Sequence, residues 1–235
     1  MQTENFQCEI LAIVVLEQTE RNIKMLDKKT LKEKIPHVSR ETIEKIESFK
    51  CLYEKWGKSI NLSSSYDMTN FLDRHILDSI QLSNLISMEE DCLDIGSGGG
   101  FPGIVLSILG QKMTLCEINS KKISFLEESR RRLGLNFKII NESAYKISTP
   151  YSFVVSRAFS SLTNLLEIQK NVSRETTVGV FPKGKSYEIE IEEAKKKWNF
   201  DIKLLDSAVH EMSKIIIVSN VRLKEVEREN CDYGA

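Results

Sequence analysis

Apolar positions recur at helical spacing over two segments in the first third of the chain. From Ile43 they follow one another at intervals of three and four, as on one face of a helix. Ser39 stands where an N-cap is expected, and Gly57 where the helix would stop. The polar loop INLSSSYDMTN then leads to a second amphipathic helix, which we expect over Phe71–Ile86. Residues 1–35 are weakly patterned, and we expect them to be helical but loosely attached.

After Glu90 the pattern changes to short β-rich runs that alternate with helical segments. The runs are CLDI, MTLCEI, FKII, FVVS, TVGVF, DIKLL and IIIVSNV. The helices expected between them are Pro102–Leu109, Lys121–Leu133, Leu162–Val172 and Tyr187–Trp198. Such alternation is typical of βαβ units and a mostly parallel sheet. No helix separates the last two runs, so they predict an antiparallel pair at one edge.

These patterns predict a doubly wound α/β sheet of about seven strands with an N-terminal helical extension. We expect this α/β domain to cover residues 88–223, with a helical region at 36–87 packed on it. Residues 1–35 would then form a separate extension, and residues 224–235 a C-terminal tail.

The amino-acid composition limits the possible binding partners of the protein and its possible cellular compartment. The 33 Lys and Arg residues nearly cancel 34 Asp and Glu residues, so a net charge of −1 gives no overall field that would attract nucleic acid. The five cysteines are dispersed without a CxxC pair, which favours free thiols in a reducing compartment and no metal site. The apolar run Ile10–Leu16 is too short to span a bilayer. We expect a cytoplasmic protein with no membrane association.

The stretch LDIGSGGGFPGIVLSI places four glycines between the first strand and its helix. Glycine there permits positive φ and close approach of the backbone to a ligand, although such a turn can also reflect tight packing alone. The spacing is D-x-G-x-G-x-G from Asp94 to Gly100. It is not the G-x-G-x-x-G of a dinucleotide motif, because Phe101 occupies the last glycine position. Glu117 follows the second strand, where a carboxylate can accept hydrogen bonds from ribose hydroxyls. These acidic groups favour S-adenosylmethionine, a positively charged cofactor, over NAD.

Five segments together carry a resemblance to a known family. INLSSS, RHILDSI, DIGSGGGFPGIVLSI, VVSRAFSSL and FPKGK occur in this order over residues 39–222. The chain resembles the RsmG (GidB) family of bacterial methyltransferases, and its tail resembles alphaproteobacterial members. This resemblance implies a Rossmann-like class I methyltransferase fold. It also implies methyl transfer from S-adenosylmethionine to N7 of a guanine in a conserved loop of 16S rRNA, with the 30S subunit or its assembly intermediate as partner.

The resemblance also implies site residues. The family's cofactor contacts fall on Gly96, Phe101, Ala144, Tyr145 and Arg157. Asp94 and Glu117 match acidic positions of the general methyltransferase pattern, and Gly98 is the middle glycine of the loop. The polar motifs that precede the sheet supply Asn61, Ser63, Arg74, His75, Asp78 and Ser79. Lys183 matches the lysine of the family's KG element.

Some positions depart from the family pattern. Tyr145 stands where many members carry an acidic residue, and Tyr66 stands where relatives often carry Arg. An Arg common in the penultimate loop is replaced around Glu211–Lys214. These differences affect the expected contact with the adenine of the cofactor and part of the expected RNA-binding surface.

The implied chemistry needs no general base, because guanine N7 has an in-plane lone pair and no proton to lose. The task is to position the base, and Arg157 and Lys183, at or after the ends of two strands, are the groups we expect to orient it or its phosphates. For each, a plain surface charge is the alternative. His75 and Asp78 share one helix face and can instead form a structural network. The basic residues Arg130–Arg132, with Lys121 and Lys122, favour a solvated helix face, and contact with RNA phosphates is the alternative.

Other function classes stay open at this point. An NAD-dependent oxidoreductase could use the same turn, although the third spaced glycine of its motif is missing. A non-catalytic rRNA-binding assembly factor could retain the fold, and methylation of a small molecule or a protein is the nearest alternative among enzymes. We expect a monomer.

Overall fold

The computed structural model describes residues 38–62 and 71–225, and it divides the chain inside the first described helix. Helix α2 covers Arg40–Gly57, and the boundary between two compact units falls between Cys51 and Leu52. The Ser39 side chain accepts a hydrogen bond from the Thr42 N–H at 3.1 Å, so the predicted N-cap is confirmed. The extension at residues 1–35 lies outside the described residues, and the domain limits stay a prediction.

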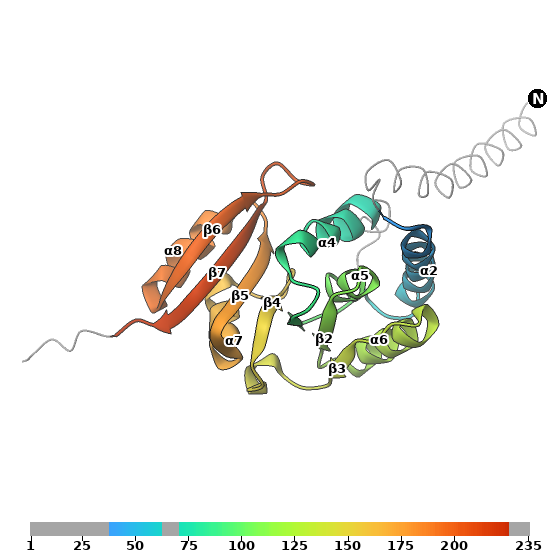
Figure 1. Cartoon of the computed structure of the whole chain (residues 1–235), viewed down its shortest axis with the longest axis horizontal. Coiled ribbons are helices and arrows are strands. Elements are labelled where there is room, and N and C mark those ends of the chain that lie inside the picture. The colour runs from blue at the N-terminus through green and yellow to red at the C-terminus, as the bar shows by residue number, and fades with distance from the viewer. Residues whose placement is uncertain (1–37, 63–70, 226–235) are drawn as a thin grey trace, which may run out of the picture. The chain divides into compact units, whose positions relative to one another are not determined.

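The second unit is built on one sheet of seven strands in the order β3-β2-β1-β4-β5-β7-β6 (Figure 1). The strands are β1 (Asp91–Ile95), β2 (Lys112–Cys116), β3 (Lys138–Ile140), β4 (Tyr151–Val155), β5 (Ser173–Lys183), β6 (Trp198–Asp206) and β7 (Lys214–Leu223). Strands β1 to β5 are parallel, and β7 runs antiparallel to both β5 and β6. The predicted doubly wound sheet with a last antiparallel pair is confirmed.

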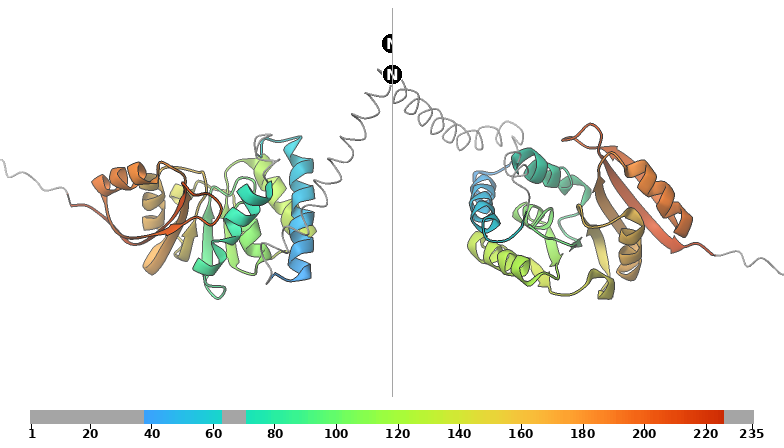
Figure 2. Two further views of the ribbon diagram at one scale, coloured as in Figure 1. Left: turned by 90° about the horizontal axis from the view of Figure 1, so that it is seen from above. Right: turned by 180° about the vertical axis from the view of Figure 1, so that it is seen from behind.

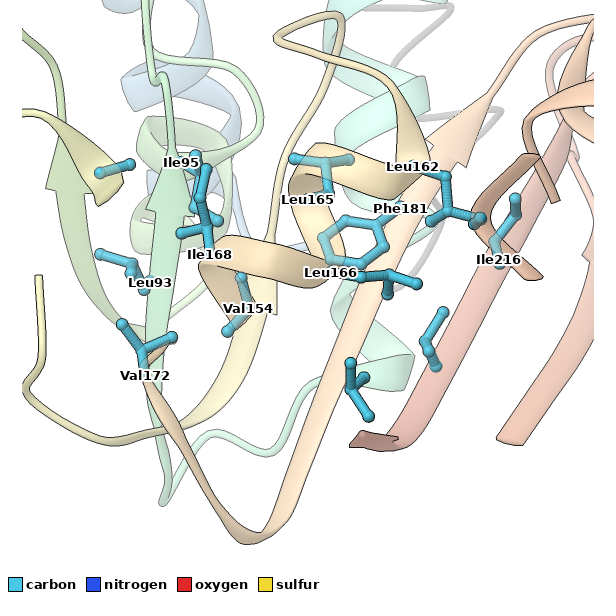
Figure 3. Close-up of a cluster of buried hydrophobic side chains, with 14 of the residues drawn as sticks. Leu93, Ile95, Val154, Leu162, Leu165, Leu166, Ile168, Val172, Phe181 and Ile216 are labelled. Carbon is cyan, nitrogen blue, oxygen red and sulfur yellow. The ribbon is translucent and has the colours of Figure 1, made fainter. Parts of the chain in front are cut away.

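Alternate residues of the central strands contact helices on the two faces of the sheet. The connecting helices are α5 (Gly103–Ile108), α6 (Ser120–Leu133), α7 (Leu162–Asn171) and α8 (Tyr187–Lys197). Leu93 and Ile95 of β1 belong to the buried cluster that includes α7 (Figure 3). Asp94, between them, lies on the opposite face beneath the start of α5. Seen from behind, α8 lies along the β6–β7 hairpin (Figure 2).

The segment predicted as one amphipathic helix over Phe71–Ile86 consists of three successive turns of different helical type. The prediction of one regular helix was therefore wrong. A π-helical turn, η1 (Leu72–Leu77), is followed by a short α-helical turn, α4 (Asp78–Ile80), and a 3-10 turn, η2 (Ser83–Leu85). In a regular α-helix the Asp78 N–H would donate to the Arg74 carbonyl. Here the Arg157 guanidinium donates to that carbonyl, and the Asp78 N–H turns to the Asp73 carbonyl five residues back. The widened turn therefore coincides with a contact from another part of the chain.

Two further sequence expectations concern cysteines and membranes. Cys51, Cys92 and Cys116 are free thiols, as predicted, and Cys8 and Cys231 lie outside the described residues. Within residues 38–62 and 71–225, no helix combines the length and apolar character needed to cross a membrane.

Candidate functional site

The loop between β1 and α5 has a backbone that needs glycine. Gly96, Gly98 and Gly100 have φ angles of +69°, +54° and +86°, a region that side chains rarely permit. These are the three alternating glycines of the sequence motif. A Cβ at Gly96 would also lie 2.2 Å from a ring carbon of Phe159. The predicted positive φ is confirmed for this loop. The close neighbour of Gly96 is a side chain of the same chain, and the approach of a ligand to the loop stays a prediction.

The Asp94 side chain bonds to the backbone at the start of α5 and does not line the cavity above the glycine loop. Its Oδ2 accepts a hydrogen bond from the Gly103 N–H at 3.0 Å, at the start of α5. The side chain is fully buried, and burial raises the pKa of its carboxyl to about 7. A Cβ at Gly103 would lie 2.5 Å from the same oxygen, so only glycine allows the contact at this distance. Asp94 therefore holds the helix start against β1.

Glu117 fastens the loop from the neighbouring strand. Its Oε2 accepts a hydrogen bond from the Gly98 N–H at 2.9 Å, and its Oε1 accepts from the N–H groups of Ile118 and Asn119, both at 2.8 Å. A carboxylate has about four acceptor positions, so Oε2 can still accept a hydrogen bond from a ligand hydroxyl. The side chain is otherwise buried.

A cavity of about 1150 Å³ opens above this loop. Segments that lie far apart in the sequence all contribute to its lining. Among the predicted site residues, those that line it are Arg74, His75, Asp78, Gly96, Gly98, Phe101, Arg157 and Lys183. The structure thus brings the RHILDS, glycine-loop, SRAF and PKG segments to a single site.

Arg157 links the end of β4 to the π-helical turn η1. Its Nη2 lies 2.6 Å from His75 Nδ1, and its Nη1 lies 3.3 Å from Asp78 Oδ2. Because a guanidinium can only donate, His75 Nδ1 accepts here, and the neutral imidazole carries its proton on Nε2. The His75 ring stacks on Phe101 at a centroid distance of 4.5 Å and an interplanar angle of 15°, and the guanidinium carbon lies 5.2 Å from the Phe101 centroid. This is a largely buried network, so Arg157 is not a plain surface charge.

Lys183 is the last residue of β5, next to β4 in the sheet. Its Nζ donates to the Ser160 carbonyl and to Glu190 Oε2, both at 2.7 Å. The same Glu190 oxygen accepts a hydrogen bond from the Leu162 N–H at 2.8 Å, at the first residue of α7. The Lys183 side chain is only 10% exposed. The lysine therefore ties the loop after β4 to α8.

The remaining predicted residues lie elsewhere or outside the described part. Ser79 is buried, and its Oγ donates to the His75 carbonyl at 2.6 Å. Asn61 is exposed and does not line the cavity, although Leu62 does. Ser63 and Tyr66 lie outside the described residues.

Ala144 and Tyr145 also stay apart from this cavity. They form the first two residues of the 3-10 turn η3 (Ala144–Lys146), where Ala144 is buried and Tyr145 is largely exposed. Their expected cofactor contacts stay a prediction.

Sequence reasoning missed several residues that line the cavity. Tyr53 is a buried residue of α2, as its helical spacing predicts, and it also lines the cavity. A Cβ at Gly99 would lie 2.7 Å from its ring, which packs against Phe101 at a centroid distance of 5.3 Å. Phe159 adjoins Arg157 in the SRAF segment but was not singled out. Glu190 lies in an acidic helical segment in which no single carboxylate stands out. Only its place in the SRAF segment could have drawn attention to Phe159, and no motif contains Tyr53.

The cavity is also lined by cations that are not among the predicted site residues. Lys122, Lys185, His210 and Lys214 line it. Lys214 forms an ion pair with Asp206 across the β6–β7 turn. Within residues 38–62 and 71–225, neither Lys122 nor Lys185 forms an ion pair. These two lysines leave positive charge at the rim.

Comparison with known proteins shows that the chain is similar in sequence to one family of methyltransferases. Residues 42–216 match the model of the GidB family, described as rRNA small subunit methyltransferase G. The chain is 46% identical over 186 residues to the ribosomal RNA small subunit methyltransferase G of Rickettsia akari, covering 78% of this chain and 97% of that protein. It is 45% identical to the protein of the same name from Rickettsia felis, with 78% and 96% covered. Among solved structures, it is similar to a SAM-dependent methyltransferase from Aquifex aeolicus, at 17% identity and a TM-score of 0.49, with 71% of this chain and 96% of that chain covered.

Proposed function

The chain belongs to the GidB family, the family of rRNA small subunit methyltransferase G, and we propose that it transfers a methyl group from S-adenosylmethionine to N7 of a guanine in 16S rRNA. One observation carries the proposal: four sequence segments of the family resemblance line one cavity above the glycine loop. A fold alone would not require the RHILDS and PKG segments to meet there. The proposed partner is 16S rRNA, within the 30S subunit or its assembly intermediate.

The residues present fit an adenosyl cofactor. The three positive-φ glycines leave the loop without Cβ atoms where a ligand would approach. Glu117 presents a carboxylate beside Gly98 that suits ribose hydroxyls. When bound, the cofactor supplies a methyl group on a positively charged sulfonium. The cavity, at about 1150 Å³, exceeds the roughly 300–1,000 Å³ typical of a site for one small ligand, so it has room for a base as well.

The proposed chemistry relies on positioning and not on proton transfer. Guanine N7 needs no base, and the neutral His75 is engaged with Arg157 and Phe101. We assign Arg157 to holding η1 and Phe101 in place at the wall of the site. Lys183 Nζ uses two of its three donor positions on Ser160 and Glu190. We assign its third donor to guanine O6 or to a flanking phosphate, which leaves N7 unobstructed.

The decisive experiment maps the methylated nucleotide. 30S subunits from a strain that lacks the gene are incubated with the purified protein and S-adenosylmethionine, and the 16S rRNA is digested and analysed by mass spectrometry. We expect one new 7-methylguanosine that is absent without the protein and reappears when the gene is restored in the strain. A methyl group on any other atom would contradict the assignment.

Ligand binding separates the other function classes. We expect S-adenosylhomocysteine to raise the unfolding temperature and NAD to leave it unchanged. Stabilisation by NAD alone would favour an oxidoreductase. Binding of 16S rRNA without any affinity for S-adenosylhomocysteine would favour a non-catalytic assembly factor.

A further inference from the structure

We propose that the ring of Phe159 is the surface on which the target guanine stacks during methyl transfer. The inference rests on the proposed function and names the residue that would hold the plane of the base. It adds an aromatic contact for the base, whereas the aromatic residues that the sequence motifs indicated, Phe101 and Tyr145, were expected to contact the cofactor.

Phe159 is an aromatic side chain left open to the cavity. It is 42% exposed and lines the cavity beside Gly96. Its ring lies so close to the glycine loop that a Cβ at Gly96 would be 2.2 Å from the nearest ring carbon. The cofactor loop therefore lies against the ring, and the exposed part of the side chain is available to a second, flat ligand.

The backbone that carries this ring is held on both sides. Before it, Arg157 is fastened to η1, and Ala158 adopts a left-handed conformation with φ of +53°. After it, the Ser160 carbonyl accepts from Lys183, and the Leu162 N–H donates to Glu190. A non-glycine residue persists in the left-handed region only where its surroundings impose it. The loop thus presents Phe159 in one defined position.

A stacked ring suits the geometry that attack by N7 requires. The lone pair of N7 lies in the plane of the base, so stacking fixes this plane and leaves every edge of the base free. A guanine taken from its RNA stack loses its neighbours, and an aromatic side chain replaces them. Lys183, which holds Ser160 one residue after Phe159, is placed to meet an edge of the same base.

The test compares four variants: F159A, F159L, F159Y and F159W. Single-turnover methylation of 30S subunits from the deletion strain is measured at saturating S-adenosylmethionine, and the dissociation constant of S-adenosylhomocysteine is measured by calorimetry. We expect F159A and F159L to slow methyl transfer by about 5- to 150-fold, the range of one lost base–aromatic contact. F159Y and F159W retain a flat ring, and we expect rates within about threefold of the wild type. Binding of S-adenosylhomocysteine should change less than about twofold in all four.

Each contrary result has a distinct meaning. A fully active F159L would show that the side chain only fills space, and equal losses in transfer and in S-adenosylhomocysteine binding would make the ring a wall of the cofactor site. Either result would overturn the stacking role while the wild type still forms 7-methylguanosine. A wild type that methylates no guanine would instead remove the proposed function and this inference with it. F200L, a phenylalanine change on β6 outside the cavity, serves as the matched control.

Discussion

Asp94 gives the glycine loop a dependence on pH. Its carboxyl is fully buried, and burial raises its pKa from 3.8 to about 7. The folded protein therefore binds this proton more tightly than the unfolded chain does. The contribution of Asp94 to the free energy of unfolding is most favourable below pH 4, declines as the pH rises from 4 to 7, and is constant above 7.

We predict that D94N removes this decline. An amide oxygen can still accept from the Gly103 N–H but does not ionise. The free energy of unfolding of D94N relative to the wild type should rise between pH 4 and pH 8, by up to ~4 kcal/mol from the size of the pKa shift. Urea unfolding at several pH values measures it. A difference between the two proteins that does not vary with pH would show that the carboxyl titrates normally.

Lys183 provides a second prediction at the residue scale. Because its Nζ touches the loop after β4 and not the glycine loop, K183A should impair methyl transfer more than the binding of S-adenosylhomocysteine. We expect at least a tenfold loss of transfer and less than a threefold change in the dissociation constant.

E190Q is the matched control for that change. It removes the charge that holds Lys183 but keeps a side-chain oxygen for the Leu162 N–H. We expect a smaller loss of transfer than in K183A. Comparable losses of transfer and of cofactor-product binding in K183A would place the lysine in the cofactor site or in the fold.

At the residue scale, the sequence predicted those features that follow from the backbone conformation a motif requires. The positive φ angles at Gly96 and Gly98 follow from the glycine spacing. The burial of Asp94 does not, because a carboxylate beside a ligand and a carboxylate beneath a helix start look alike in one sequence. Glu190 could not be predicted either, since its partners come from two other segments.

At the scale of elements, η1 shows how a distant side chain alters a helix. The Arg157 guanidinium takes the Arg74 carbonyl, which would otherwise accept from the Asp78 N–H. Periodicity predicted the helix over Phe71–Ile86 but not its widened turn, and Arg157, whose guanidinium contacts this turn, lies some eighty residues later in the chain. The strands and the other helices were predictable, because local alternation of apolar runs is enough to define them.

We predict that R157M restores a regular turn. Methionine has comparable length but no donors, so the Asp78 N–H can return to the Arg74 carbonyl. Backbone chemical shifts of residues 72–80 should move toward α-helical values. Asp78 would lose its cation in a largely buried site, so the unfolding temperature should fall by several degrees.

The double variant R157M/D78N serves as its control. It removes the uncompensated charge and should recover part of the lost stability while the turn stays regular. A π-helical turn that persists in R157M would show that other contacts impose it.

At the scale of the whole molecule, attraction to RNA must be local because the net charge is −1. Lys122 and Lys185 line the cavity and form no ion pair within the described ranges 38–62 and 71–225. Salt-dependent binding to phosphates should therefore depend on a small number of rim lysines.

We predict that K122A and K185A each lower the steepness of that salt dependence. The slope of log affinity for 16S rRNA against log salt concentration should decrease in magnitude by about 0.7 to 1 for each lysine, with ~50–200 mM salt as the useful range. Filter binding measures it. K195A, on α8 and paired with Glu192, should leave the slope unchanged. An unchanged slope in both rim variants would place the RNA surface elsewhere.

The fold class of the whole molecule was predictable from alternating apolar runs, but the acceptor of the methyl group was not. Guanine and rRNA were inferred from the family resemblance of the RHILDS, SRAF and PKG segments. That these segments line one cavity is seen only in the structure. Long-range contacts such as that of Arg157 with η1 have no local signature in one sequence.

The position of β7 between β5 and β6 has a consequence for the order of events during synthesis. Strand β5 ends at Lys183 and its partner β7 ends at Leu223, so about 40 residues must be added before β5 gains its second neighbour. At ~5–20 residues per second, that interval is roughly two to eight seconds. During it, the nascent chain presents an unpaired strand edge that includes Val180 and Phe181, both buried in the finished sheet. A ribosome that stalls within this stretch would hold the chain with this edge unpaired and open to aggregation.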